Sequence, residues 1–473
     1  MILRNKASLP MPSKPFLFIV FLVALVFSFF CFTTNPVSWF DEGIYFQVVR
    51  NVADSGTWGV QTAPGVSSDL SLISVGYPAF LPAALAFKIF SPSIIVLRLV
   101  AILFLLGLAT VFYLLSLKLY GPRLALFSTA LLITFSPLYG NGKNFLGEVP
   151  GLFYFFAGLL ILLFLERGEG RKWPIVFLAG VFFGLAASAK PVFLLILPAL
   201  AAAFLFQWRE FFMKKDGWIF MLVLGLGVLL ALFGWLSTQF GPSVSFERIW
   251  AHYSNPYYVT DYTPLVLSNL KRFFTESTPL HFLILLALAS WFLGRGFFRK
   301  EKLRLVEIAA FIFSLLVGFA YLRTTGWYRN FFPGHVVLFL FLAPGIKSLA
   351  ESFFREHAVR IFYVAVSAAV LIQLFPLAKE NLWCRSDAPT ALEPYLNSIP
   401  EEKSVFFLTV PQIDARFKNQ NFYQYLKMSE HLKLGEENIA LMRAGKFDTI
   451  FVPQGLSEEI SKISACYELQ ENV

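Results

Sequence analysis

The sequence predicts an all-α polytopic membrane protein with a small α/β domain at its C-terminal end. Of the 473 residues, 57% are hydrophobic and 15% are charged, whereas a soluble protein carries about 25% charged residues. Apolar runs of about 17–25 residues recur along the chain, and each is long enough to cross a hydrocarbon core of roughly 30 Å. After residue 379 the composition becomes polar and mixed in charge. These observations exclude a purely soluble protein.

The apolar runs predict about eleven transmembrane helices in residues 15–378. The first follows a basic start, but the "CFTTNP" after it lacks the small residues of a signal-peptidase site, so we expect an uncleaved anchor. The predicted spans are centred near Val23, Leu106, Leu131, Ala157, Leu178, Leu200, Leu226, Leu286, Phe313, Leu340 and Val366.

The distribution of basic residues predicts the orientation of these spans. The net charge is +9, but the Lys and Arg residues lie between spans, which argues against a nucleic-acid partner. Placing residues 1–14 in the cytoplasm puts 19 Lys and Arg in the inner segments and 10 in the outer segments before residue 379. This is the asymmetry of the positive-inside rule. The sequence contains no N-x-Ser/Thr acceptor site, which favours the plasma membrane of a prokaryote.

Two short helices are expected in the first outer loop. Residues 41–54 place apolar side chains along one face, which is typical of an amphipathic helix lying at the membrane surface. Residues 76–90, "GYPAFLPAALAFKIF", are too short and too rich in proline for a span, so we expect an interfacial or re-entrant helix. The next span is expected to begin near Arg98.

Residues 379–473 are expected to form an extracytoplasmic α/β domain. The segments 404–410 and 449–452 predict strands, and the segments 420–434 and 436–444 predict helices. Of the three cysteines, Cys31 falls in the first predicted span, whereas Cys384 and Cys466 lie in this domain and could form a disulfide there.

Most residues that could perform chemistry lie on the predicted outer face. Asp41 and Glu42 are adjacent, directly after the first span and among the aromatic residues of "WFDEGIY". Basic residues accompany acids in the later outer segments. Arg329 breaks the positive-inside pattern on a short outer loop, which favours an anionic partner there. The candidates are Asp41, Glu42 and Glu148 for catalysis; Lys190, Arg329 and Lys143 for a phosphate; and Trp39, Tyr45, Tyr77, His252, Tyr328 and His335 for the substrate region.

Structural roles remain open for several of these residues. Asp41 lies three residues after Ser38, as in a capping box that opens the helix 41–54. Lys190 can extend along a helix end toward the membrane surface, and Arg98 is expected to anchor to lipid headgroups. His335 lies in an aromatic environment in which a histidine is more often packed than a ligand.

Five motifs follow one another along the chain. They are "FDEGIYFQVVRNV", "YPAFLPAALAFKIFSPSIIVLRLVAIL", "GKNFLGEVPGLFYFFAGLLIL", "SAKPVFLLILP" and "WYRNFFPGH". In this order they resemble the motifs of the GT-C integral-membrane glycosyltransferases. The similarity is to the protein O-mannosyltransferase and aminoarabinose (lipid A) transferase families, and it covers roughly residues 15–380.

This resemblance implies a polyprenyl-phosphate sugar as donor and a hydroxyl group of a lipid, glycan or protein as acceptor. Asp41 would be the general base, and Glu42 or Glu148 would position the sugar or hold a divalent metal such as Mg²⁺ or Mn²⁺. Lys190 and Arg329, with Lys143, would neutralise the leaving phosphate. The C-terminal domain would help to bind the acceptor.

Two other functions are compatible with this sequence. A transporter or lipid flippase would place charges near mid-membrane and often shows inverted repeats, neither of which we find in the sequence. A non-catalytic scaffold of the same fold is the second alternative, and the acidic pair argues against it.

Overall fold

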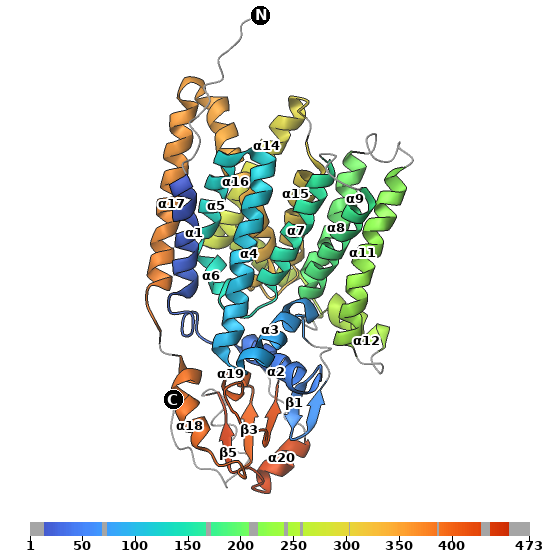
Figure 1. Cartoon of the computed structure of the whole chain (residues 1–473), viewed down its shortest axis with the longest axis vertical. Helices are drawn as coiled ribbons and strands as arrows, with labels where there is room; N and C mark the ends of the chain where they lie inside the picture. Colours follow the sequence, from blue (N-terminus) through green and yellow to red (C-terminus); the bar gives the residue numbers. More distant parts are fainter. Residues whose placement is uncertain are drawn as a thin grey trace, which may run out of the picture.

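The computed structural model describes residues 14–68, 73–166, 172–207, 216–240, 245–255, 259–301, 303–385, 387–426 and 436–453. A helical bundle occupies one part of the elongated molecule and a small α/β domain occupies the other (Figure 1). Two short helices lie between them. The predicted fold class is confirmed.

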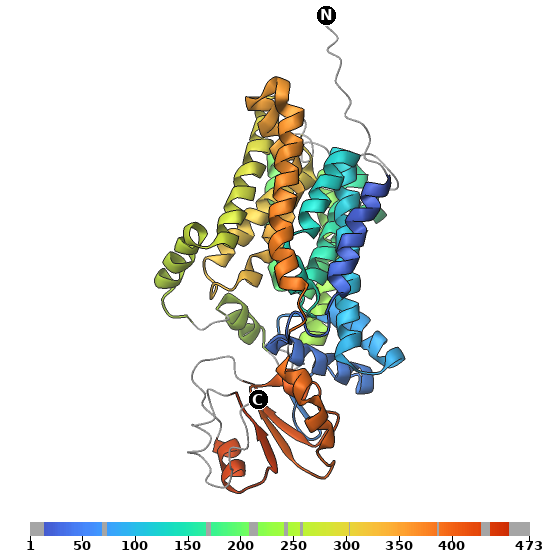
Figure 2. The same cartoon turned by 90° about the vertical axis from the view of Figure 1, so that its left-hand side faces the viewer.

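Long, approximately parallel helices form the bundle (Figures 1 and 2). Its helices are α1 (Lys14–Phe29), α4 (Ile94–Tyr120), α5 (Pro122–Ile133), α6 (Ser136–Gly142), α7 (Glu148–Glu166), α8 (Lys172–Ala189), η1 (Pro191–Leu195), α9 (Ile196–Phe206), α11 (Asp216–Gln239), α14 (Ser277–Phe298), α15 (Leu305–Tyr321), α16 (Phe332–Phe353), η3 (Arg355–His357) and α17 (Ala358–Asn381). Helix α16 is buried on all sides from Phe332 to Gly345. Such all-round burial is typical of a helix in the centre of a bundle.

Seven helices in the described part of the chain are long and apolar enough to cross a membrane, and a bent pair makes up to eight. The pair is α5 and α6, whose axes differ by 66°. The three other predicted spans correspond to shorter apolar helices at Pro15–Phe29, Pro191–Phe206 and Leu305–Tyr321. These fall below the roughly 20 residues that cross a bilayer without assistance. All eleven predicted segments are therefore helical, and the chain is a multi-pass membrane protein.

The first loop lies across the end of the bundle that faces the α/β domain (Figure 1). Both predicted short helices are present, as α2 (Phe40–Ser55) and α3 (Tyr77–Phe90). Between them, β1 (Val60–Ala63) and β2 (Val66–Ser68) form an antiparallel hairpin. The helices α12 (Phe246–Ser254) and α13 (Thr263–Thr275) and the turn η2 (Tyr328–Asn330) belong to later loops.

The C-terminal domain is built on a three-stranded parallel sheet. Its strands are β3 (Val405–Leu408), β4 (Phe422–Tyr425) and β5 (Thr449–Phe451), in the order β4-β3-β5. Helices α18 (Ala388–Ser398), α19 (Pro411–Asp414) and α20 (Glu436–Arg443) surround it. The predicted helix at 420–434 is wrong where the structure describes it, because alternate residues of "FYQY" are buried and form the edge strand β4.

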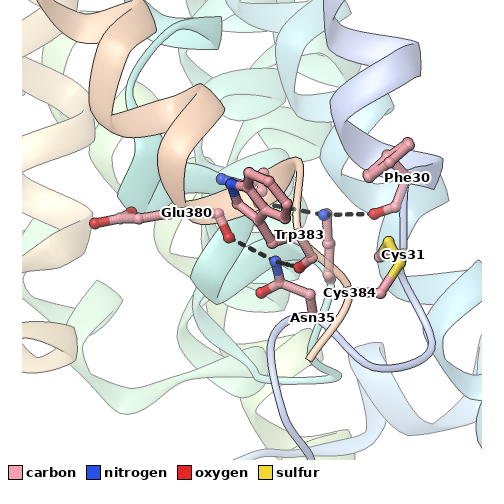
Figure 3. The surroundings of a disulfide bond; sticks show 8 residues. Phe30, Cys31, Asn35, Glu380, Trp383 and Cys384 are labelled. Carbon is pink, nitrogen blue, oxygen red and sulfur yellow. Dashed lines mark hydrogen bonds between the residues drawn. A yellow bond between two sulfur atoms is a disulfide. The ribbon is translucent and has the colours of Figure 1, made fainter. Parts of the chain in front are cut away.

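A disulfide ties the first loop to the end of the bundle (Figure 3). Cys31 lies two residues beyond α1 rather than within a span, and it pairs with Cys384. Cys384 is therefore not available to Cys466, which lies outside the described residues. Beside this disulfide, the Asn35 side-chain amide donates to the Trp383 carbonyl at 3.0 Å. The predicted domain boundary at residue 379 falls in the last turn of α17.

Candidate active site

Two carboxylate–cation pairs meet where the first loop covers the bundle. The side chains are Asp41 with Arg329 and Glu148 with Lys190. They come from segments far apart in the sequence, yet each belongs to a helix end: the start of α2, the turn before α16, the start of α7, and the junction of α8 with η1. Acids in the first turn of α2 and α7 also interact favourably with the helix dipoles.

Asp41 and Arg329 form the more accessible pair. Arg329 donates from its Nη1 to the Asp41 Oδ2. The Asp41 side chain is 8% exposed, whereas that of Arg329 is 25% exposed. Burial alone would lower the pKa of Arg329, but Asp41 and Glu148 raise it above its ordinary value. The guanidinium is thus permanently charged and open to solvent on one side.

Glu148 and Lys190 form the second pair, with Lys190 Nζ 3.1 Å from Glu148 Oε1. The same ammonium donates to the Ser74 hydroxyl at 2.9 Å. Glu148 is buried, and its other oxygen, Oε2, has no hydrogen-bond partner among the described residues. A buried carboxylate oxygen without a donor is costly. It is therefore a ready acceptor for a ligand hydroxyl.

The Tyr45 hydroxyl connects the two pairs. It is buried in α2, one helical turn after Asp41, and it interacts electrostatically with Asp41, Arg329 and Glu148. Burial raises the pKa of Tyr45 well above 10, and Asp41 and Glu148 add to the increase, while Arg329 and Ser74 oppose it. A phenol that stays protonated can donate a hydrogen bond but cannot serve as a base.

Local sequence explains why Lys190 and Glu148 meet. Pro191 disfavours a helical conformation at the residue before it, and Lys190 is extended, with φ −155° and ψ 124°. Helix α8 therefore ends at Ala189, and the lysine side chain leaves the helix axis. On the other side, a Cβ on Gly147 would lie 2.5 Å from the Ala189 carbonyl oxygen. Glycine at 147 thus allows the start of α7 to approach Lys190 closely.

The structure corrects the predicted role of Glu42. Its Oε2 accepts from Arg98 Nη2 at 2.6 Å, and its Oε1 accepts from Arg98 Nε at 2.9 Å and from the Phe145 amide at 3.1 Å. Both side chains are buried. Arg98 also donates to the carbonyls of Phe32 and Pro36. Glu42 has no free oxygen for a sugar, and Arg98 is a core residue rather than a headgroup anchor.

Lys143 is also removed from the candidate phosphate site. It is buried, and its Nζ donates to the Phe30 carbonyl at 3.0 Å and to Asn381 Oδ1 at 3.2 Å. These contacts tie the end of α6 to α1 and α17. These contacts account for a buried lysine at position 143 without a ligand.

An aromatic group lies next to Arg329. Trp39 is 41% exposed and contacts Trp327 edge-on at 5.9 Å between ring centroids, and the Arg329 guanidinium lies 4.9 Å from the Trp327 centroid. Next to Arg329 in the sequence, Tyr328 has its hydroxyl 3.2 Å from His335 Nδ1. Trp39 and Tyr328 therefore belong to the surroundings of the site.

The other three residues predicted for the substrate region lie elsewhere or are not described; they are His335, Tyr77 and His252. His335 is buried and also contacts His281, with 3.0 Å between His335 Nε2 and His281 Nδ1, as expected for a packed histidine. The Tyr77 hydroxyl donates to the Ala231 carbonyl on α11. Tyr77 thus borders the Ser74 segment without facing Asp41. The side chain of His252 lies outside the described residues.

The capping box expected at the start of α2 is absent. The N-cap residue is Trp39, and no side chain caps the helix. Ser38 instead donates its hydroxyl to Asp387 Oδ2 at 2.8 Å. Asp41 is consequently not engaged in capping.

Among the described residues, no three His, Cys, Asp or Glu side chains cluster as metal ligands. The two carboxylates at the site, Asp41 and Glu148, are each engaged by a cation. Mg²⁺ is commonly held by one or two carboxylates together with substrate phosphates and water. The divalent metal implied by the resemblance therefore stays a prediction, and no step is derived through it.

Sequence reasoning missed Ser74 and the buried partner of Glu42. Ser74 is an uncharged residue before a proline-marked helix, and nothing in its local pattern marks it. The Arg98–Glu42 pair spans 56 positions. Only the folded first loop brings these residues together.

Comparison with known proteins finds one family model and several solved structures that are similar to this chain. Residues 78–235 match the family described as dolichyl-phosphate-mannose-protein mannosyltransferase. ArnT from Cupriavidus metallidurans in the apo state superimposes with a TM-score of 0.58 at 12% identity, covering 91% of each chain. The apo oligosaccharyltransferase of Archaeoglobus fulgidus gives a TM-score of 0.61 at 12% identity, covering 95% of this chain and 68% of that one.

The chain shares its fold with ArnT and with the archaeal oligosaccharyltransferase. The resemblance expected from the sequence motifs is thus confirmed across most of the chain. The family match at 78–235 contains Glu148 and Lys190 but neither Asp41 nor Arg329. No curated protein sequence matches this chain.

Proposed function

We propose that this GT-C protein is a membrane glycosyltransferase that moves a sugar from a polyprenyl phosphate to a hydroxyl acceptor at the outer face of the membrane. The observation that carries the proposal is the convergence of Asp41 with two cations, Lys190 and Arg329, at one end of an apolar bundle. A solved structure of ArnT contains undecaprenyl phosphate, and one of the archaeal oligosaccharyltransferase AglB contains dolichol phosphate. We extend that donor class to this chain.

Asp41 is the general base in this proposal. The acceptor oxygen attacks the anomeric carbon, the bond from that carbon to the phosphate oxygen breaks, and the acceptor proton passes to an Asp41 carboxylate oxygen. A positioned base contributes about a hundred- to ten-thousandfold to such a step. The leaving polyprenyl phosphate departs with the bonding electrons.

Lys190 and Arg329 stabilise the negative charge on that phosphate. Arg329 contacts Asp41 in the structure, and its guanidinium is partly exposed. The donor phosphate competes for this guanidinium, which releases Asp41 to accept a proton. Donor binding thereby prepares the base.

Glu148 and Tyr45 orient the sugar. Glu148 Oε2 accepts a sugar hydroxyl, since it has no partner within the described chain. Tyr45 remains protonated and donates. The sugar is a hexose or a pentose, and the acceptor is a lipid, a glycan or a protein.

Orientation follows from the basic residues between the spans. With the N-terminus in the cytoplasm of a prokaryote, the α/β domain and the Asp41 cluster are outside the plasma membrane. A donor exposed at the outer leaflet then reaches the site from the bilayer.

The test uses purified protein in lipid with a panel of radiolabelled polyprenyl-phosphate sugars and membrane extract. Wild type is compared with Asp41→Asn, and Asp54→Asn is the matched control, since Asp54 is an exposed acid on the same helix. Transfer by wild type and Asp54→Asn, but not by Asp41→Asn, supports the proposal. Equal transfer by Asp41→Asn refutes the base assignment. Absence of transfer from every donor, with lipid or solute crossing vesicles, establishes the transporter instead.

A further inference from the structure

Helix α2 lies between the bundle and the C-terminal domain, and its two opposite faces have different neighbours (Figure 1). A helix of about 3.6 residues per turn places Asp41 and Tyr45 on one side, and Gly43, Gln47 and Arg50 on the other. The first side carries the candidate active site. All three residues of the second side contact the C-terminal domain.

A buried polar cluster connects Gln47 to that domain. The Gln47 side-chain amide donates to both Asp414 oxygens at 2.6 Å. Gln424 donates at 2.5 Å to Gln47 Oε1 and also donates to the Gln61 carbonyl. All of these side chains are buried. In a low-dielectric interior, such a network allows one arrangement and penalises any other, because a displaced member would lose its partners.

Backbone contacts place α2 equally closely against α19. A Cβ on Gly43 would lie 2.3 Å from the carbonyl carbon of Pro411, so only glycine permits this approach. Arg50 is buried, and its Nη1 donates to the Phe417 carbonyl at 3.1 Å. Contacts therefore extend over two turns of α2.

A second cluster holds the chain just before Asp41. Ser38 donates its backbone amide to Asp387 Oδ1 at 3.1 Å and its hydroxyl to Oδ2 at 2.8 Å. Arg416 Nη2 lies 2.9 Å from Asp387 Oδ2 and donates to the Ser38 hydroxyl at 3.0 Å. Asp387 and Arg416 both belong to the C-terminal domain. Asp41 is thus flanked on both sides by residues that this domain holds.

We propose that the C-terminal domain is a clamp that positions Asp41 for catalysis, with Gln47 and Asp414 as its positioning residues. This inference rests on the proposed transferase function. It assigns the domain a part in the chemical step, in addition to any contact with the acceptor. A displacement of about 1 Å at a reacting group can lower the rate about a hundredfold, so a loosened α2 impairs transfer although no catalytic group is altered.

The test compares Asp414→Ala with Asp414→Asn in the full-length protein in lipid. Asparagine keeps an acceptor for the Gln47 amide, whereas alanine removes it and leaves the amide only its longer hydrogen bond to Gln424 Oε1, at 3.2 Å. Asp414→Ala should lower kcat by about ten- to a hundredfold with unchanged donor affinity, and Asp414→Asn should restore kcat. Backbone amides of α2 should exchange hydrogen faster in Asp414→Ala only. Lys403→Ala is the control, since its partner Asp448 is on the exposed part of the same domain.

A wild-type kcat in Asp414→Ala would overturn the clamp, as would equal losses in the Ala and Asn variants. If Asp414→Ala does not accumulate, Gln47→Met is the second variant, and it should again lower kcat without weakening donor binding. Hydrogen exchange separates this proposal from the proposed function. Faster exchange in the α2 of Asp414→Ala, with no transfer by wild type, would show that the domain holds α2 but would refute the transferase and with it the catalytic role of the clamp. Unchanged exchange in Asp414→Ala, with an active wild type, would refute the clamp alone.

Discussion

Asp41 and Glu42 are adjacent in α2, but their carboxylates lie in different surroundings. Glu42 is buried, and Arg98 and the Phe145 amide hold its two oxygens. Among the described residues, the Asp41 side chain pairs with Arg329 alone, which comes from a short turn and is 25% exposed. A carboxylate surrounded by fixed donors supports the fold, whereas one with an exchangeable partner can react. This difference is why we assign Glu42 a structural role and propose the catalytic role for Asp41.

Removal of Arg98 should have the largest effect on stability. Arg98→Ala leaves Glu42 charged and unpaired in the interior, which costs about 3–5 kcal/mol in the free energy of unfolding. The double variant Arg98→Ala with Glu42→Gln should recover part of this loss. Thermal unfolding in detergent measures it, with the exposed Lys88→Ala on α3 as control. A single variant as stable as wild type would contradict the structural role of the pair.

Loss of the Cys31–Cys384 disulfide should rank next. Cys384→Ser opens a link between positions 353 residues apart, and removal of a disulfide costs about 2–4 kcal/mol. This link joins the chain before α2 to the chain after α17, so the variant should also make the C-terminal domain more sensitive to limited proteolysis. Cys31→Ser should behave identically. If the two variants differ in the rate at which the protease cleaves the C-terminal domain, their effects do not come from the loss of one shared disulfide.

Lys190 extends the comparison to the second pair of the site. Lys190→Ala should weaken donor binding by about ten- to a hundredfold, because a hydrogen bond to a charged group contributes about 1.5–3 kcal/mol. Lys190→Arg should retain most of the affinity. Equilibrium binding of a polyprenyl phosphate measures this, and the exposed Lys271→Ala is the control. Unchanged affinity in Lys190→Ala would remove this residue from the phosphate site.

Asp414 provides a third acid for comparison, and its effect depends on pH. Burial raises its pKa well above the ordinary value, although Arg50 and Gln47 lower it in part. In the unfolded chain the pKa of an aspartate is about 3.9. The stabilisation that protonated Asp414 contributes is therefore complete below that pH, and it is lost as the pH rises through the pKa of Asp414 in the folded protein. Asp414→Asn cannot ionise, and its melting temperature relative to wild type should rise by about a few degrees from about pH 5 to about pH 8. A constant difference would show that Asp414 does not titrate.

Much of the fold could be predicted because it depends on local composition. The apolar runs located the bundle helices, and the proline-marked segment before Arg98 located α3. The edge strand β4 was predicted as a helix because its short alternating pattern acquires meaning only beside β3. The partner of Cys384 could not be predicted from the sequence, since only the fold brings Cys31 near it.

The candidate site could be predicted in part for a related reason. Charged residues at helix ends on one side of a membrane indicated Asp41, Glu148, Lys190 and Arg329, and the structure brings these four together. Their chemical roles remain predictions. Sequence could not separate Glu42 from Asp41, because the distinction depends on Arg98, 56 positions away in the chain.

The most direct measurement is a side-by-side determination of transfer rate and melting temperature for Asp41→Asn and Glu42→Gln. The account predicts that Asp41→Asn melts like wild type, binds the donor at least as tightly, and loses about a hundred- to ten-thousandfold in kcat. Glu42→Gln should melt at a lower temperature because Arg98 loses its charged partner. Wild-type transfer by Asp41→Asn, or a Glu42→Gln protein that is fully stable yet inactive, would contradict it.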